Sequence, residues 1–296
     1  MARKARFWLA AGTVAALLGI VVWRNLPALH LRPLGAEPAA ETLTRPADVP
    51  STSTNEGRAQ ARPEKAARVE AFQALKLRAE AGDRVAQRLL AETYADCYVV
   101  NLDREAFMSS LDVKKQLLSD TNQKRVLEQA TRERIAKCDA VEGGGQLEPQ
   151  LAAYWYAEAA KRGDLAARAM VRGQDLSRHD PVVTARLLEE VLASGDPAAI
   201  FHFGITLRVD DAVNSGSPTE ALATGAMASW AWIVAGCRMG YDCGPASRVM
   251  ESNCLEVNGC TGEDLDAYVR NELPTDADRK DLERRVTEIL RLVEGQ

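Results

Sequence analysis

The cysteines are the residues whose type and number in this chain most clearly predict chemistry. There are six of them, at Cys97, Cys138, Cys237, Cys243, Cys254 and Cys260. Six thiols in an oxidising compartment predict three disulfides, for which fifteen connectivities exist. The alternative is a zinc site made by the last four, but their C-x5-C-x10-C-x5-C spacing departs from the usual zinc-binding spacings and no histidine lies nearby. We therefore expect disulfides, no metal and no other cofactor.

The common catalytic signatures are missing from the sequence. It contains no G-x-S-x-G, no S-x-x-K, no Walker loop, no H-E-x-x-H and no G-x-G-x-x-G. His202 lies between Phe201 and Phe203, so we expect it to be packed or half-exposed rather than to act as a ligand or base. The adjacent carboxylates Glu189 and Glu190 would point in different directions from a helix, which favours solvated charges. No catalytic residue is assigned.

The elements that carry these residues are marked by a glycine–aspartate turn that recurs four times. The turn residues are Gly82 with Asp83, Gly163 with Asp164, Gly195 with Asp196, and Gly240 with Asp242. A glycine just beyond a helical pattern adopts the left-handed conformation that ends a helix, because it has no Cβ to clash. The aspartate then accepts hydrogen bonds from the free N–H groups that begin the next helix. Each turn therefore predicts a pair of helices, in an all-α chain.

Positions counted from each glycine predict how the paired helices pack. The fourth residue after the glycine is Ala86, Ala167 or Ala199, and Ala246 once a two-residue insertion in the fourth copy is allowed. Small residues there would let two helices approach closely. The apolar residues beyond them should form a continuous core. These predicted core residues are Leu89, Leu90, Met170, Val171, Phe203, Val249 and Met250.

One copy of the repeat carries a family pattern. The segment AAYWYAEAAKRGDLAARAMV, residues 152–171, has Trp155, Tyr156, Ala159, Ala160, Gly163, Asp164 and Ala167 at fixed offsets. This pattern resembles the Sel-like repeat, a relative of the tetratricopeptide repeat. The resemblance implies a right-handed solenoid of antiparallel helix hairpins. The uneven intervals between the four glycines indicate a degenerate array with insertions, since repeats of this family recur about every 36 residues.

The resemblance also bears on the disulfides. Cys237 and Cys243 flank the Gly240 turn, as do the cysteines that join hairpins in exported, cysteine-containing bacterial members of the family. Cys254 and Cys260 repeat that spacing, and a rigid helix between Cys243 and Cys254 would hold those two roughly 15 Å apart. We therefore favour pairing within each close pair, which leaves Cys97 for Cys138, although the sequence alone does not fix the connectivity.

The first 30 residues differ from the rest in kind. Three basic residues precede an uncharged apolar run over residues 7–23, which is long enough for a membrane-spanning helix. Residues 1–30 are therefore predicted to be a single-pass inner-membrane anchor with its N-terminus in the cytoplasm and the body in the periplasm. A cleaved signal segment, and thus a secreted protein, is the alternative.

Two further segments follow the anchor. Residues 31–63 are rich in Pro, Ala, Ser and Thr and predict a disordered linker. Residues 64–296 form the predicted repeat domain, which ends in a capping helix over 275–294. This domain holds 29 Lys and Arg against 38 Asp and Glu, so it has no basic footprint for nucleic acid.

These observations together predict a membrane-tethered periplasmic scaffold. A helical-repeat array offers an extended surface for a protein or peptide partner, so an adaptor is the expected function. A cell-envelope enzyme with an unrecognised site, or an accessory subunit of an envelope complex, is the alternative. The sequence does not name the partner.

Overall fold

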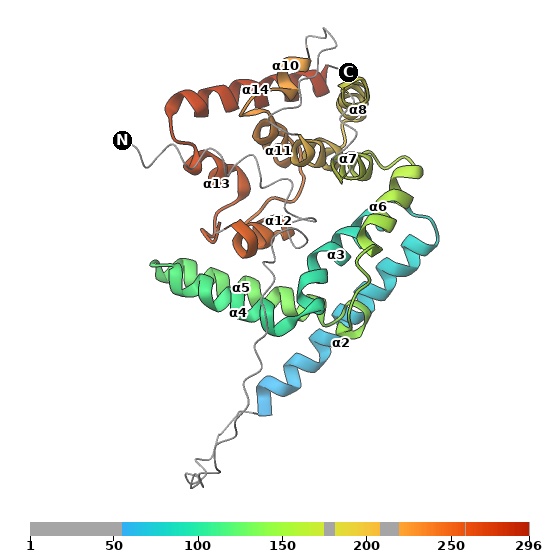
Figure 1. Ribbon diagram of the computed structural model, residues 1–296, viewed down its shortest axis with the longest axis vertical. Helices are drawn as coiled ribbons and strands as arrows, with labels where there is room; N and C mark the ends of the chain where they lie inside the picture. The colour runs from blue at the N-terminus through green and yellow to red at the C-terminus, as the bar shows by residue number, and fades with distance from the viewer. Residues whose placement is uncertain (1–54, 175–180, 208–218, 258, 296) are drawn as a thin grey trace, which may run out of the picture.

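The computed structural model describes residues 55–174, 181–207, 219–257 and 259–295 (Figure 1). Within these ranges every regular element is a helix, as the all-α prediction requires. The expected anchor over residues 7–23 lies outside them, and so does most of the expected linker. None of the described helices is both long enough and apolar enough to cross a bilayer.

The helices follow one another as short, mostly amphipathic segments. The first group is α2 (Asn55–Glu80), α3 (Arg84–Leu102), α4 (Arg104–Leu117), α5 (Thr121–Cys138), η3 (Val141–Gly144), α6 (Leu151–Lys161) and α7 (Leu165–Gln174). The second group is α8 (Pro181–Ser194), α9 (Pro197–Thr206), α10 (Glu220–Ala223), α11 (Ala228–Arg238), α12 (Arg248–Ser252), η4 (Asn253–Val257), α13 (Leu265–Glu272) and α14 (Asp276–Glu294). Helix α2 includes residues 55–63, which the composition predicted as linker.

The first three turns have the predicted conformation. Gly82, Gly163 and Gly195 have φ values of +92°, +84° and +59°. The Asp83 carboxylate accepts hydrogen bonds from the N–H groups of residues 85 and 86, and Asp196 accepts one from that of residue 198. These aspartates therefore begin helices α3 and α9 as N-caps, and Asp164 begins α7 in the same way, by accepting from residue 167.

The fourth turn corrects the prediction. Gly240 has a φ of +109°, as expected, but Asp242 accepts a hydrogen bond from the Gly244 N–H and begins no helix. The next helix begins only at α12, where the Ser247 hydroxyl accepts from the N–H of residue 250. Ala246 therefore precedes α12 and is exposed, so the inserted residues delay the helix rather than merely shift its register.

A continuous series of helix contacts runs from α2 to α14. α2 contacts α3, α3 contacts α6, and the series continues through α7, α9 and α11 to α14 (Figure 1). The first two turns lie side by side, because the Arg84 guanidinium donates to the Gly163 carbonyl at 3.2 Å. The first hairpin thus rests on the second.

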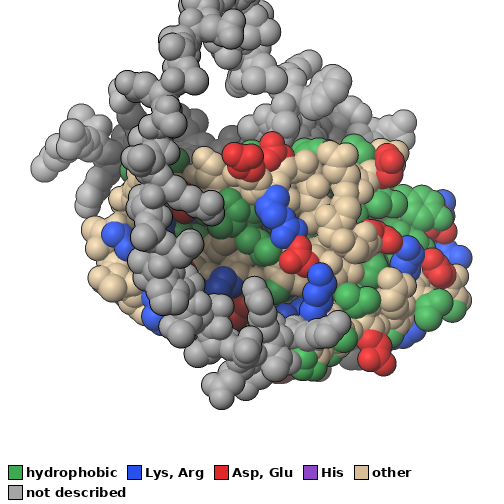
Figure 2. Space-filling view, turned by 90° about the horizontal axis from the view of Figure 1, so that it is seen from below, with side chains coloured by type: hydrophobic (Ala, Val, Ile, Leu, Met, Phe, Trp, Pro, Cys, Tyr) green, Lys and Arg blue, Asp and Glu red, His purple; other side chains and the backbone are tan. Residues whose placement is uncertain are grey.

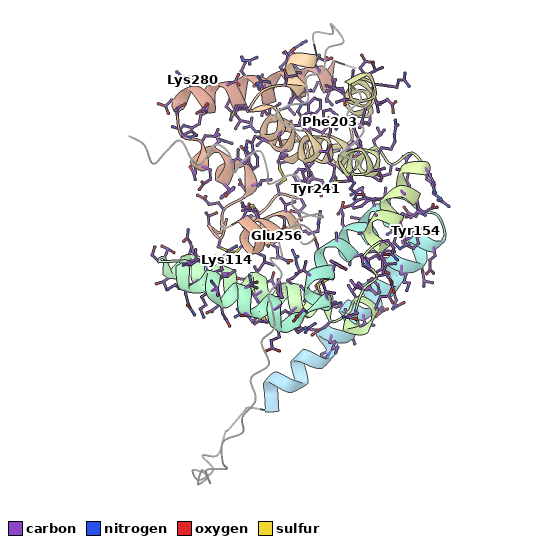
Figure 3. The ribbon with its side chains drawn as sticks, in the orientation of Figure 1. Lys114, Tyr154, Phe203, Tyr241, Glu256 and Lys280 are labelled. Atoms are coloured by element: carbon purple, nitrogen blue, oxygen red, sulfur yellow. A yellow bond between two sulfur atoms is a disulfide. The ribbon has the colours of Figure 1, made fainter. Side chains whose placement is uncertain are left out.

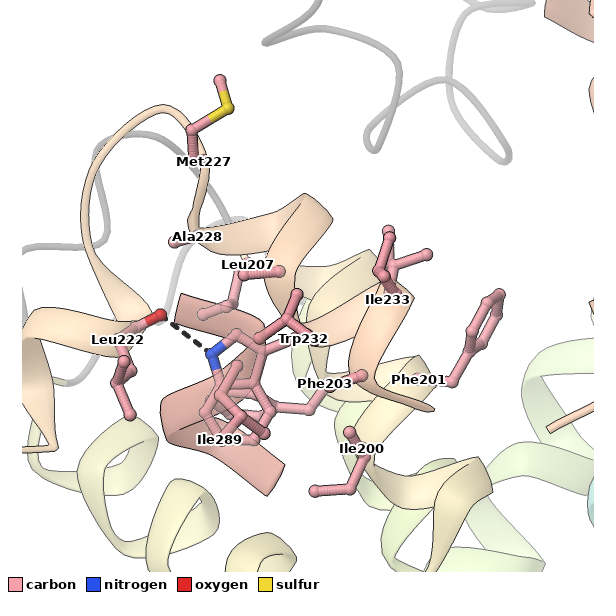
Figure 4. Close-up of a cluster of buried hydrophobic side chains, with 14 of the residues drawn as sticks. Ile200, Phe201, Phe203, Leu207, Leu222, Met227, Ala228, Trp232, Ile233 and Ile289 are labelled. Atoms are coloured by element: carbon pink, nitrogen blue, oxygen red, sulfur yellow. Dashed lines mark hydrogen bonds between the residues drawn. The ribbon is translucent and has the colours of Figure 1, made fainter. Parts of the chain in front are cut away.

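Helices α9 and α11 approach each other closely in the core. A Cβ on Gly204 would lie 2.7 Å from the backbone nitrogen of Ile233, and one on Gly236 would lie 2.8 Å from that of Phe201. Trp232 fills the space beside this contact and donates from Nε1 to the Leu222 carbonyl at 2.9 Å (Figure 4). The two glycines allow backbone to pack against backbone here.

Most of the predicted core residues are confirmed. Ala86, Ala167 and Ala199 are fully buried, and so are Leu90 and Phe203. Met250 is also buried, while Met170, Val171 and Val249 are partly so. Leu89 is the exception, because it turns away from this face of α3 and 37% of it is exposed.

The C-terminal helix is confirmed where the sequence placed it. α14 begins after Thr275, whose hydroxyl accepts from the N–H of residue 278. Leu282, Val286 and Ile289 are completely buried against the preceding helices, α8 and α11 among them. The opposite face carries charged residues, so α14 covers the end of the series with a polar surface.

Candidate functional site

The six cysteines form the three expected pairs. Cys97 is bonded to Cys138, Cys237 to Cys243 and Cys254 to Cys260. The helix between Cys243 and Cys254 is shorter than expected, since α12 spans only Arg248–Ser252. The first bond joins α3 to the end of α5, and the residues beside it, Asp96 and Lys137, belong to a charged cluster.

This ionic cluster is built on one face of α3. Arg88, Glu92 and Asp96 are spaced four apart, which places them one above another on a helix. Their side chains are 7%, 3% and 6% exposed. Burying a charge is costly unless partners replace its water, so each of these three must be paired.

Glu92 receives partners from three helices. Its Oε1 lies 3.0 Å from Arg88 Nη1 and 3.0 Å from His202 Nε2. Its Oε2 lies 3.4 Å from Nε of Arg248. Glu92 therefore joins α3 of the first hairpin to α9 of the third and α12 of the fourth.

Asp96 forms the second centre of the cluster. Its carboxylate is 2.8 Å from Arg248 Nη1 and 3.2 Å from Lys137 Nζ, while its backbone carbonyl accepts from Arg134 Nη1 at 3.0 Å. Arg134 also pairs with Glu251. The charges of α5 and α12 thus converge on the residue that precedes the Cys97 disulfide.

A turn residue also belongs to the cluster. Asp164 Oδ1 begins helix α7 through the residue 167 N–H, while its Oδ2 lies 3.2 Å from Arg88 Nε. The aspartate that the repeat pattern identified as an N-cap therefore also links the second hairpin to the first.

Aromatic rings close one side of the cluster. Tyr241, near the centre of the molecule in Figure 3, stacks on Phe201 with ring centroids 4.1 Å apart, and its hydroxyl lies 3.4 Å from His202 Nε2. His202 is 1% exposed, so the prediction that it packs inside is confirmed. Its Nδ1 has no hydrogen-bond partner among the described residues.

The partners determine how the carboxylates titrate. Burial on its own would raise the pKa of Glu92, but Arg248, His202 and Arg88 outweigh it and hold that pKa well below its ordinary range. Burial likewise opposes a lowered pKa at Asp96, where Arg248, Arg134 and Lys137 prevail. Both groups remain anions at neutral pH. A carboxylate held in this way is a weak base, so the geometry favours positioning over acid–base catalysis.

The sequence led to part of this site and missed the rest. Among the residues it identified, Asp164, Cys97 and Cys138 lie in the cluster or beside it. The remaining ones are not part of the cluster: the cysteines of the other two disulfides, the glycines Gly82, Gly195 and Gly240, and the aspartates Asp83, Asp196 and Asp242. The charged residues Arg88, Glu92, Asp96, Arg134, Lys137 and Arg248 were missed. The one available signal was the four-residue spacing of charges on α3 beside buried Ala86 and Leu90.

Other sequence candidates lie apart from the cluster. Glu190 pairs with Arg168 at a partly exposed position, consistent with its expected solvation. In the ranges that the structure describes, no group of three or more His, Cys, Asp or Glu is arranged to hold a metal ion.

Comparisons with known proteins add no assignment. No protein-family model, no curated protein and no solved structure matches this chain. The resemblance to Sel-like repeats therefore depends on the residues quoted above.

Proposed function

We propose that this protein is a membrane-tethered periplasmic scaffold whose stacked helix hairpins bind a protein or peptide partner. The observation that carries the proposal is the serial packing of α3, α6, α7, α9, α11 and α14. Such nearest-neighbour stacking is what a Sel-like solenoid requires, and solenoids present extended surfaces to partners.

The surface of the array supports a protein partner. Several large apolar side chains of the first two hairpins are exposed, including Leu77 at 65%, Val99 at 54% and Tyr154 at 54%. On the face shown in Figure 2, acidic, basic and hydrophobic side chains of the described residues are interspersed, with no gathered basic patch. A mixed surface of this kind suits a protein better than a nucleic acid.

The disulfides support the periplasmic location. Three disulfides persist in an oxidising compartment and are rare in the cytosol. A reporter fused after Gln296 tests this location in the intact cell. Activity of a periplasm-dependent reporter is expected, and activity of a cytoplasm-dependent reporter would contradict the proposed orientation.

Site-specific photocrosslinking in membranes tests partner binding. A photoreactive amino acid replaces Tyr154 on α6, and in a second variant Leu77 on α2. Lys280, exposed on α14 and on the other side of the view in Figure 3, is the control position. The expected result is one protein adduct of constant mass from the two test positions and none from the control.

Two outcomes would count against the scaffold. Adducts that are equally frequent at Lys280 would show nonspecific contact, and the absence of any adduct at Tyr154 and Leu77 would remove the proposed surface. The enzyme alternative gains no support from the ionic cluster, because its two central carboxylates are held as paired anions.

A further inference from the structure

The hairpin formed by α4 and α5 is inserted between the first two repeats and reaches the last one. It lies beside α12 and η4, although more than a hundred residues separate the two segments in the chain (Figure 1). We call residues 104–138 together with residues 248–257 and 259–262 the clasp. Through the clasp, the last hairpin packs against the insertion that follows the first hairpin.

Polar contacts hold the two sides of the clasp together. Lys114 Nζ on α4 donates to the Cys254 carbonyl at 2.5 Å and to the Leu255 carbonyl at 2.9 Å (Figure 3). Arg134 on α5 pairs with Glu251 and donates to the Ser252 hydroxyl at 2.8 Å. Both cations thus reach across the clasp to the backbone or side chains of the last repeat.

An apolar seam lies beside these contacts. Leu111, Leu127 and Ala130 of the hairpin form one buried cluster with Cys254, Leu255 and Cys260 of the last repeat. This cluster is separate from the two larger buried clusters, one around α9, α11 and α14 and the other around α2 and α3. It would lose its partners if the hairpin moved away, so the clasp is a distinct packing unit.

Two of the three disulfides involve residues of the clasp, and the third does not. Cys97–Cys138 fixes the base of the hairpin against α3, and Cys254–Cys260 lies inside the apolar seam. All four of these cysteines are at most 1% exposed. The third bond, Cys237–Cys243, staples the Gly240 turn, where Cys237 is partly exposed and Cys243 is 7% exposed.

We propose that the clasp is a redox-set closing device. The Cys97–Cys138 bond holds Asp96 where Arg134 and Lys137 of α5 and Arg248 of α12 converge, while closure of the seam buries the Cys254–Cys260 bond. Oxidation of Cys97 and Cys138 therefore closes the clasp, and closure protects the Cys254–Cys260 bond from later reduction. This inference does not depend on the identity of any partner, so it can fail or succeed separately from the proposed scaffold function.

The chemistry of closure is thiol–disulfide exchange. The two thiols of Cys97 and Cys138 give up two protons and two electrons to the disulfide of an oxidised dithiol catalyst, which leaves as a dithiol. The Sγ–Sγ bond forms while both sulfurs are accessible, before Phe72, Tyr94 and Val141 pack around them. Once this core has formed, no attacking thiolate reaches them.

Amide hydrogen exchange on the full chain tests the role of this bond. The variant Cys97→Ser/Cys138→Ser lacks the disulfide at the base of the hairpin. The matched control, Cys237→Ser/Cys243→Ser, lacks the disulfide of the Gly240 turn. We expect exchange over residues 248–262 to rise by about tenfold or more in the first variant, while α9 and α11 change much less. The control should leave exchange in α4 and α5 unchanged.

Two results from this comparison would overturn the proposal. One is unchanged exchange over residues 248–262 when Cys97 and Cys138 are replaced. The other is an equal rise over the whole chain, which would indicate general destabilisation. Retained protection in α9 and α11 shows that the variant has folded.

A second experiment uses the wild-type protein and needs no variant to fold. The native protein is treated with dithiothreitol and then with an alkylating reagent, and labelled cysteines are identified by mass. Cys237 and Cys243 should be labelled about tenfold faster or more than Cys254 and Cys260, because the bond between the latter two lies inside the closed seam. Labelling of Cys254 and Cys260 at the same rate as Cys237 and Cys243 would contradict a closed clasp.

Discussion

Glu92 shows how one residue connects three parts of the molecule. Because it pairs with Arg88, His202 and Arg248, replacing it leaves these partners buried without their anion. We expect Glu92→Gln to lower the free energy of unfolding by about 3–5 kcal/mol. Urea unfolding at pH 7 measures the change. Glu128→Gln, which removes an exposed pair with Lys115, is the control and should have little effect, so similar losses in the two variants would contradict the role of the cluster.

The same carboxylates predict how stability depends on pH. The ordinary pKa values of Glu92 and Asp96 are 4.5 and 3.8, and both are lowered in the folded protein. The unfolded chain therefore binds more protons in acid, and the stability these groups contribute is full above about pH 5 and lost as the pH falls further. Urea midpoints measured from pH 7 to pH 3 should fall, and less steeply in Glu92→Gln. A midpoint that stays constant over this range would exclude the linkage.

Single residues also show what a sequence reveals and what it does not. The turns at Gly82, Gly163 and Gly195 were predictable, because the positive φ that ends a helix there depends on the local sequence. The partners of Asp96 were not, because Arg134 and Arg248 lie on other helices and a charged residue on a helix usually faces water. Burial of charge depends on tertiary packing, which no local pattern records.

The contact of α9 with α11 gives a prediction at the level of helices. Gly204→Ala would place a Cβ 2.7 Å from a backbone nitrogen, so the two helices must separate. Overpacking of this kind costs typically about 1–3 kcal/mol. Thermal unfolding should therefore occur at a lower temperature than in the wild type. Gly244→Ala is the control, because the nearest atom to its Cβ would be 3.7 Å away; an equal shift in the control would refute the explanation.

Helix boundaries were predictable where caps and apolar stripes agree. Helix α14 matches its predicted span because Thr275 begins it and Leu282, Val286 and Ile289 form one face. The start of helix α12 was predicted too early. Asp242 resembles an N-cap in sequence, but its carboxylate accepts a hydrogen bond from the Gly244 N–H and begins no helix. Asp242 and Ser247 both belong to residue types that favour an N-cap, and the conformation of the folded backbone places Ser247 at the start of α12.

The end of the series gives a prediction for the whole molecule. Deleting residues 276–296 removes α14 and exposes the apolar surface of α8 and α11 that it covers. Apolar surface uncovered in this way promotes association, so the truncated protein should bind a hydrophobic dye and self-associate. Dye fluorescence and light scattering measure both effects. Full-length protein with Arg284→Ala on the exposed face of α14 should behave as wild type, and a truncated protein that did so too would argue against a capping role.

The contacts that close the clasp also determine when the chain can finish folding. Arg134 and Glu251 are 117 residues apart, and Arg248 and Asp96 are 152 apart. A chain that emerges from the N-terminus can form α3, α5 and their disulfide long before residue 248 appears. The carboxylates of Glu92 and Asp96 therefore stay solvated until Arg248 can pair with them. Final assembly is therefore a late, nonlocal step of folding, and contacts of such long range form slowly.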